Sequence, residues 1–337
     1  MPNTIELFKK NAPELLDKIY KAESTTSDFD INGALVQAGK NANEIIVPVL
    51  DMDGLGDYDR NSGYIDGDVS LTNETKKFNY ERGRKLKTDT IDNEETGGVI
   101  LGNLSAEFLR TKVIPEVDAV RYATYASIPG ISKSEETTYS NAEAVYKAIA
   151  KAWDDMTNDE VPEENRHLRI TSTLLGMIRD MDTYKSKDLL SKFASIKVVP
   201  QVRFQTAIEL LSGKDSDGER KGGFKKAQAV YEASTDTTVT EGKVYYTKSG
   251  DTYTKVETPT GNPSTSNYYE KTVEESKDIN FMIIHKPALL QYTKHNKMKL
   301  FTPDQDQDGD NYKWLYRLYG LNEYYNNKVA GIYLSHK

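Results

Sequence analysis

The strongest constraint on this fold is one helical pattern that runs from Asp92 to Ser127. Apolar side chains recur at steps of three and four residues up to Phe108, and the stripe then continues one position over, from Leu109 to Val113 and beyond. A helix of about thirty residues is roughly 45 Å long, about the width of a whole domain. Pro115 removes one backbone donor inside the pattern, so we expect a kink there rather than an end. The alternative is two shorter core helices that break at Pro115.

An acidic segment precedes this helix. Residues 51–75 contain six aspartates and four glycines, with few large apolar side chains. They lie between EIIVPVL at 44–50 and KKFNYERGRKLKT at 76–88, which we expect to be the two strands of a projecting β-hairpin. A long acidic excursion that does not bury itself is either disordered or docked on another surface. The basic residues of the returning strand would face a neighbour's carboxylates, which predicts an interface that weakens as salt rises.

The composition describes a soluble chain rich in interface-type side chains. It has 22 tyrosines against nine phenylalanines, and tyrosine suits contacts where one end of the side chain is apolar and the other is wet. The net charge of -8 predicts no general affinity for nucleic acid or anionic membranes. The lack of cysteine excludes disulfides, thiolate metal sites and cysteine nucleophiles. No apolar run is as long as a signal-peptide core or a membrane span.

The remaining segments alternate helices and short strands. Residues 1–22 have an amphipathic pattern that predicts a helix, and a polar arm follows at 24–30. Such a terminal helix suits packing on a neighbouring chain as well as on its own core. Helices are expected at 141–156 and 173–181, a helical turn at 287–292, and strands at 166–171, 196–204, 279–285 and 328–334. Pro200 places the strand 196–204 at a sheet edge. Residues 231–270 are rich in Thr, Tyr and Ser, and expected strands at 243–247, 252–256 and 268–271 predict a small all-β module.

Motifs for metal binding, phosphate binding and catalysis are all incomplete. Asp304–Gly309 copies the first half of an EF-hand loop, but Leu315 stands where a bidentate Glu is needed, so we expect weak calcium binding or none. The segment 33–41 resembles a phosphate loop but has one residue too many. The four histidines lack metal-ligand spacing, and no pair of carboxylates has an apolar setting. We therefore expect no catalytic residue, no metal and no cofactor.

Two stretches of this sequence are similar to the major capsid proteins of tailed bacteriophages, whose fold is shared with herpesvirus shells. One is KKFNYERGRKLKTDTIDNEETGG…VIPEVDAVRYATYAS at 76–127, with its IPE-D-R core. The other is FMIIHKPALLQYTKHNKMKLFTPD…NKVAGIYL at 281–334. The resemblance implies an α+β fold in which an N-terminal arm and an extended β-hairpin loop precede a long spine helix. That helix belongs to a peripheral domain, and an axial domain follows it.

The resemblance also implies a division of the chain. The N-terminal arm is 1–44, the hairpin loop is 45–90, the peripheral domain is 91–139 with 300–337, and the axial domain is 140–228 with 272–299. Residues 229–271 are an inserted β-module outside the common fold. In this family the hairpin reaches over the adjacent subunit. Contacts between subunits are therefore expected at Asp57, Asp59, Asp66, Arg82, Arg84, Glu116, Asp118 and Arg121.

The implied function is structural rather than enzymatic. The chain would assemble as hexamers and pentamers into the icosahedral shell of a virion, after synthesis in the host cytoplasm. Its expected partners are further copies of itself, a separate scaffolding protein, a portal, and encapsidated DNA bound without sequence specificity, with no membrane. The alternatives are a phage tail or baseplate structural protein and, less favoured, a calcium-binding adhesion protein.

Overall fold

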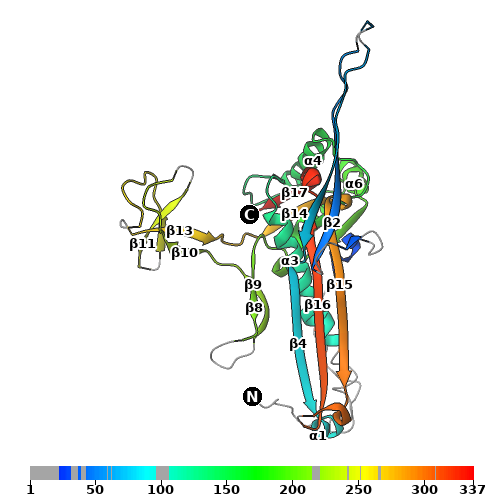
Figure 1. The fold of residues 1–337 in the computed structure, drawn as a ribbon, viewed down its shortest axis with the longest axis vertical. Helices are drawn as coiled ribbons and strands as arrows, with labels where there is room; N and C mark the ends of the chain where they lie inside the picture. Colours follow the sequence, from blue (N-terminus) through cyan, green and yellow to red (C-terminus); the bar gives the residue numbers. More distant parts are fainter. Residues whose placement is uncertain are drawn as a thin grey trace.

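The computed structural model describes residues 23–31, 37–38, 43–58, 60–61, 63–95, 106–214, 221–240, 243–250, 252–264, 267–307 and 309–337. Its elements follow one long axis (Figure 1). A central sheet with helices lies between a long three-stranded sheet at one end and a projecting hairpin at the other, and a small sheet stands to one side. The fold is α+β, as predicted. The helix predicted over residues 1–22 lies outside the described residues.

The central sheet has five strands in the order β5-β17-β14-β6-β7. They are β5 (Ser132–Lys133), β17 (Ile332–His336), β14 (Ile279–His285), β6 (Arg166–Ile170) and β7 (Ser195–Val198). Every residue of β14 is buried, because this apolar strand lies in the middle of the sheet and both of its faces are covered. β7 is an edge strand, as predicted, but it ends at Val198. The predicted continuation of this strand to residue 204 is wrong, because Gln201–Arg203 form a 3-10 turn.

Three helices contribute to the core on one face of this sheet. They are α4 (Ala142–Asn158), α5 (Ser172–Asp180) and α6 (Tyr184–Ser191). Trp153, Ile178 and Leu189 of these helices share one apolar cluster with Phe281 of β14. Asn141 caps α4 by accepting a hydrogen bond from the backbone amide of Ala144 at 2.8 Å. The helices predicted at 141–156 and 173–181 are confirmed, whereas the short polar helix α6 is not predicted from the sequence.

The long sheet has the strand order β15-β16-β4. Its strands are β15 (Leu289–Phe301), β16 (Asn311–Tyr324) and β4 (Tyr80–Asp89). The predicted helical turn at 287–292 is largely wrong: a short 3-10 turn covers Lys286–Ala288, and β15 begins at the next residue. Neither β15 nor β16 is predicted from the sequence, because lysine, asparagine and tyrosine side chains obscure the alternation of apolar residues.

The predicted long helix is continuous from residue 106 to Ser127. Leu109–Val113 form a π-helix and Ile114–Ser127 form α3, and the residues flanking the π-helix have α-helical dihedrals. Pro115 accounts for the wider turn, because proline has no N–H to donate and its ring clashes with the carbonyl four residues earlier in a regular α-helix. The prediction that the helix continues through Pro115 is confirmed, and a break there is wrong. Towards the N-terminus, α1 (Thr90–Glu95) is described and residues 96–105 are not.

This helix joins two cores. Phe108 and Val113 pack with Tyr316 on the inner face of the long sheet. Further along the helix, Tyr122 and Tyr125 are fully buried in the core on the second face of the central sheet. The apolar stripe predicted for this part of the helix is therefore confirmed, and it connects the long sheet to the central sheet.

The acidic segment projects from the body on a β-hairpin (Figure 1). β2 (Glu44–Met52) pairs with β3 (Val69–Lys77) without a register shift, and β1 (Gln37–Ala38) lies beside β2. The hairpin is as predicted, but its returning strand is 69–77, and residues 80–89 form β4 of the long sheet. Asn79 marks the change of sheet, because its side-chain amide exchanges hydrogen bonds of 2.7 and 3.0 Å with the backbone of Asn322 in β16.

A four-stranded sheet in the order β10-β13-β11-β12 forms a separate unit beside the body. Its strands are β10 (Val230–Ala233), β11 (Tyr245–Ser249), β12 (Thr252–Lys255) and β13 (Tyr268–Val273). The strands predicted in 243–271 are thus confirmed. Tyr231 on one edge strand stacks on Tyr253 of the opposite edge strand, with ring centroids 4.0 Å apart. A flat sheet would hold these edges three strand spacings of about 4.8 Å apart, so this sheet is coiled.

Two connections cut across the predicted division of the chain. β17 belongs to the predicted 300–337 segment, yet it pairs with β14 in the central sheet. β15 crosses the predicted boundary between residues 299 and 300. A further hairpin, β8 (Ile208–Ser212) with β9 (Gly222–Lys226), lies against the π-helix and β4.

Candidate assembly surfaces

The arm at 24–30 docks on its own chain through a buried aspartate. Asp118 of α3 has no exposed surface. Its carboxylate accepts hydrogen bonds from Ser24 Oγ at 2.9 Å, the Thr25 amide at 2.9 Å and Thr26 Oγ1 at 2.7 Å. Arg203 Nη1 lies 3.2 Å from the same carboxylate and balances its charge. A buried carboxylate is stable only with such partners, so the cluster fixes the arm to the helix.

Two further arginines complete this attachment. Arg121 donates to Asp30 Oδ1 at 2.9 Å, and Arg169 donates to Asp28 Oδ2 at 2.6 Å. Phe29 lies between them with no exposed surface, and its ring centroid is 4.5 Å from the Arg169 guanidinium carbon. We call this set the arm clamp: residues 24–30 with Asp118, Arg121, Arg169 and Arg203. Residues 24–30 of the arm thus pack on the core of their own chain, whereas the placement predicted for the terminal helix concerns residues 1–22, which lie outside the described residues.

Charges around Asp28 keep this carboxylate of the arm clamp ionised, and the neighbouring His167 is neutral. Burial acts to raise the pKa of Asp28, but the adjacent Arg169 and Lys197 outweigh burial and hold that pKa below its ordinary value. His167 packs edge-on against Phe29 at 5.3 Å. Burial and the Arg169 charge lower the pKa of His167 from 6.5 to about 4, so this imidazole is neutral at pH 7.

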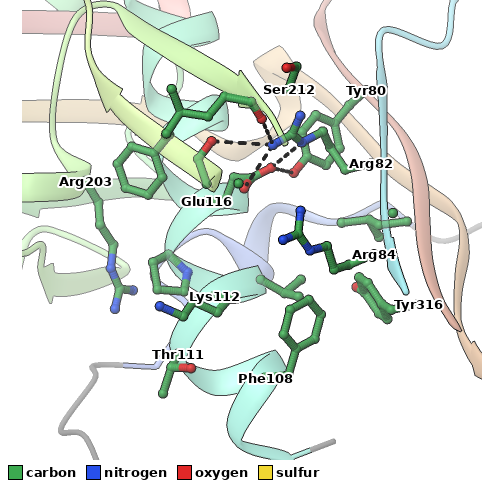
Figure 2. A pocket seen from close by; sticks show the side chains of 18 of the residues that line it. Tyr80, Arg82, Arg84, Phe108, Thr111, Lys112, Glu116, Arg203, Ser212 and Tyr316 are labelled. Carbon is green, nitrogen blue, oxygen red and sulfur yellow. Dashed lines mark hydrogen bonds and ion pairs between the residues drawn. The ribbon is translucent and has the colours of Figure 1, made fainter. Parts of the chain in front are cut away.

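Between β4, the π-helix and the β8–β9 hairpin lies an open groove of about 760 Å³, which we call the lateral groove. Figure 2 shows the ion pair at one end of it. Arg82 Nε donates to Glu116 Oε1 at 2.7 Å, and Tyr80 donates to the same oxygen at 3.1 Å. Arg82 also donates to the carbonyls of Leu211 and Gly223, at 2.8 and 3.4 Å. Burial and the neighbouring Glu116 raise the pKa of Tyr80, which stays a neutral donor.

Among the described residues, the other charged side chains that line the lateral groove are cationic (Figure 2). Arg84 lies under the backbone of β8–β9: a Cβ added at Gly213 would lie 2.7 Å from Arg84 Nη1. Gly213 has a φ of +71°, a left-handed backbone conformation that favours glycine, whereas the Arg84 guanidinium could move to admit a side chain. The remaining lining combines cations with apolar side chains: Lys112, Arg203, Phe108, Val113, Pro115, Val202 and Phe224.

The hairpin presents opposite faces at its base and towards its tip. Ile45 and Val47 are buried against Leu290 and Leu321 of the body. Successive side chains of a strand alternate between faces, so Leu50 and Met52 point the other way, and they are 55% and 63% exposed. Their cross-strand partners complete the exposed apolar face, and these are Leu71 and Val69, at 68% and 65% exposure.

The tip itself is acidic and also carries large apolar side chains. Asp53 and Asp68 close it, with the Asp68 amide donating to Asp53 Oδ2 at 2.7 Å. Asp57 and Asp66 are exposed, whereas Asp59 lies outside the described residues. The exposed apolar side chains of the tip are Leu55, Tyr58, Tyr64 and Ile65.

The structure thus distributes the predicted contact residues over three places. Asp57 and Asp66 lie on the hairpin tip, Arg82 and Arg84 with Glu116 line the lateral groove, and Asp118 and Arg121 belong to the arm clamp. A role between subunits stays a prediction for all of them. Sequence reasoning missed the apolar hairpin face, although the alternation of Pro48, Leu50 and Met52 with Val69 and Leu71 was a usable signal.

The EF-hand-like segment offers no assembled metal site. Among the described residues no three His, Asp or Glu side chains are grouped to hold a metal ion. The Asp306 carboxylate instead pairs with Lys313 and accepts a hydrogen bond from Asn311 at 3.1 Å. Asp308 lies outside the described residues. In the part of the chain that the structure describes, no helix is long and apolar enough to cross a bilayer.

Solved phage capsid structures match this fold over nearly its whole length. The asymmetric unit of the mature capsid of bacteriophage PhiM1 matches with a TM-score of 0.57 and 9% identity, covering 99% of this chain and 92% of that chain. The capsid of Myoviridae phage XM1 gives 0.54 and 9%, covering 97% and 96%. The capsid structure of cyanophage P-SCSP1u gives 0.53 and 12%, covering 98% and 92%. No family model and no curated protein matches the sequence.

These likenesses show a fold. Sequence identities of 9 to 12% carry no residue-level correspondence, so the roles of individual side chains rest on the contacts described above. The predicted resemblance is confirmed at the level of the fold: the chain has the phage major capsid protein fold. The likenesses do not favour the tail or baseplate alternative.

Proposed function

We propose that this chain, which has the phage capsid fold, is a major capsid subunit that self-assembles into the icosahedral shell around a phage genome. The observation that carries the proposal is the exposed apolar face of the hairpin. The side chains of Leu50, Met52 and Leu71 are apolar and exposed to water. Burying one such side chain in an interface contributes about 1.5–3 kcal/mol to the free energy of association. A second copy that covers this face is the simplest source of that burial. Weak contacts repeated around a closed shell add by multivalency.

The elements support the following roles in such a shell. The continuous helix that ends at Ser127 is the spine helix of a peripheral domain, together with the long sheet. The five-stranded sheet with α4, α5 and α6 is the axial domain. The β2–β3 hairpin is the extended loop that reaches an adjacent subunit. The coiled sheet within 229–271 is an inserted module that decorates the outer face.

The partners follow from the same proposal. The chain assembles with itself as hexamers and pentamers, with help from a separate scaffolding protein and a portal. It encloses DNA without reading its sequence, and the net charge of -8 agrees with the lack of a general nucleic-acid-binding surface. Its role is structural rather than enzymatic, its place is the virion capsid, and assembly takes place in the cytoplasm of the bacterial host.

Shortening the hairpin tests this proposal. Replacing residues 52–68 by a two-residue turn should leave the monomer folded, because the hairpin base is anchored by Ile45 and Val47. It should abolish closed particles in negative-stain micrographs and in sedimentation. The matched control replaces residues 229–271 with a short Gly-Ser linker, which should leave particles intact. Normal particles from the shortened hairpin would contradict the proposal.

A further inference from the structure

We propose that one face of the small β-module binds a neutral saccharide chain. Six of the 22 tyrosines lie within residues 229–271, and four of them share this face. Tyrosine rings offer flat apolar surfaces on which the C–H faces of sugar rings stack, and the phenol hydroxyls can bond to sugar hydroxyls. The inference goes beyond the proposed capsid function, because a single unassembled chain carries the whole site.

The strand register places the four tyrosines on one face of the coiled sheet. Tyr246 of β11 lies directly opposite Tyr269 of β13. Tyr231 of β10 lies opposite the residue two positions after Tyr269. Tyr253 of β12 lies opposite the residue two positions after Tyr246. Side chains two positions apart on a strand point the same way, so all four share one surface, which we call the tyrosine face.

The four rings form one connected aromatic surface. Tyr231 stacks on Tyr253 with ring centroids 4.0 Å apart. Tyr246 packs edge-on against Tyr231 at 4.9 Å, and Tyr269 packs edge-on against Tyr253 at 5.3 Å. All four side chains are partly exposed, and no hydrogen bond joins their hydroxyls to another described residue. Lys248 adds a further donor, with its amine 5.4 Å from the centroid of Tyr253.

The module has its own core on the opposite face of the sheet. Tyr245 is fully buried there, and its hydroxyl donates to Asp236 at 2.7 Å. Lys243 pairs with the same carboxylate at 2.9 Å and with Glu270 at 3.0 Å. The module stands to one side of the body (Figure 1), and among the described residues no apolar cluster of the body includes the four tyrosines. The tyrosine face is thus open to solvent rather than packed into either core.

The charges and the size of the tyrosine face favour a neutral saccharide as its occupant. Lys271 pairs with Glu274 at 2.8 Å, and Lys255 lies 4.0 Å from Glu257. These pairs leave little net charge, whereas a nucleic acid or another polyanion needs a strongly basic surface. Four strands of four to six residues present a face of roughly 300 Å². A stable protein interface takes about 800 Å² from each partner, so this face is too small for a second protein.

Binding of saccharide probes to the full chain tests the assignment. The probes are maltohexaose, cellohexaose, mannohexaose and chitohexaose, and calorimetry should show a Kd of about 1 mM or tighter for at least one of them. Tyr231→Thr with Tyr253→Thr removes the stacked pair but keeps residues that suit strands, and it should weaken that Kd at least ten-fold. The control is Tyr184→Thr, which removes an 84% exposed tyrosine of α6 and should leave the Kd unchanged. Binding of no probe, or an unchanged Kd in the double variant, would overturn the assignment.

A second pair of variants separates recognition from folding of the module. Tyr231→Phe with Tyr253→Phe keeps both rings and removes two hydroxyls, so near-ultraviolet circular dichroism should show an intact module while the affinity falls a few-fold. Replacing residues 229–271 with a short Gly-Ser linker should abolish binding. A saccharide that still binds the linker variant would place the site elsewhere. Tighter binding of heparin or of single-stranded oligo-dT to the tyrosine face would also overturn the neutral saccharide.

Discussion

The arm at 24–30 and the tip of the hairpin resemble each other in composition, but the arm packs on its own chain and the tip is exposed. Both are short, polar and acidic. The carboxylates of Asp28 and Asp30 meet Arg169 and Arg121 of their own body, and the arm becomes part of the core. Asp57 of the tip forms no ion pair among the described residues, and apolar side chains stand exposed around it. Both segments are acidic, so acidity does not explain the difference. The arm packs on its own chain because the body offers buried arginines to its carboxylates.

The largest effect is expected from removing the centre of the arm clamp. Asp118→Ala leaves the buried Arg203 without its carboxylate and removes the acceptor of four hydrogen bonds from Ser24, Thr25 and Thr26 of the arm. Breaking a buried ion pair from one side costs about 3–5 kcal/mol of unfolding free energy. Urea denaturation of the unassembled chain measures it, with Asp66→Ala on the exposed tip as the control. A loss below about 1 kcal/mol would mean that the arm is not held there.

The hairpin should respond in the opposite way, with assembly lost and stability kept. Leu50→Ser with Leu71→Ser removes the centre of the exposed apolar face, so fewer contacts are available to a neighbour. Particle yield in sedimentation should fall to background, while the unfolding free energy changes by less than about 0.5 kcal/mol. Thr72→Ala, one residue away on the other face of β3, is the matched control. Equal yields from both variants would show that this face stays in water.

Acid should loosen the arm clamp before it affects the hairpin. The pKa of His167 is lowered from 6.5 to about 4, so the unfolded chain binds a proton in that window and the folded chain does not. Stability therefore falls as pH falls from 6.5 to 4, by at most about 3 kcal/mol. Asp28, with its pKa lowered, adds a further loss below about pH 4, where the unfolded carboxyl is protonated first.

Thermal unfolding between pH 7 and pH 4 measures this loss. His167→Asn should flatten the dependence over the window, because the titrating group is gone. His285, whose pKa is also lowered by burial, should account for part of the remaining slope. An unchanged slope in His167→Asn would assign the acid sensitivity to other groups.

Salt should have the smallest effect and should act on assembly alone. The aspartates of the hairpin tip are exposed, so their attraction to cationic side chains of a neighbouring copy is screened at about 0.15 M salt and above. Contacts of Leu50 and Met52 are not screened. The assembly rate should fall a few-fold between low and high salt with little change in final yield. A complete loss of particles at high salt would assign the interface to charge rather than to apolar burial.

The sequence predicts elements well where the pattern is local. The helix capped by Asn141, the buried strand 279–285 and the strands of the small sheet all have clear periods or turn residues. It fails where the partner is remote. The Ser24–Asp118 and Asp28–Arg169 contacts join residues more than ninety positions apart, so no local sequence pattern predicts them. For the same reason the sequence pattern places residues 80–88 in the hairpin, whereas the true partner of β4, which is β16, follows much later in the chain.

The π-helix explains a detail of the sequence itself. A π-turn is an α-helix that has taken in one additional residue, and each additional residue rotates everything after it by about 100°. This additional residue explains why the apolar stripe in the sequence shifts by one position between Phe108 and Leu109. Deleting one residue from the stretch 109–113 would rotate the rest of the helix by about 100° and turn Asp118 and Arg121 away from the arm together. One additional residue thus sets the direction in which the side chains after it point, and this direction aligns the helix with both the long sheet and the central sheet.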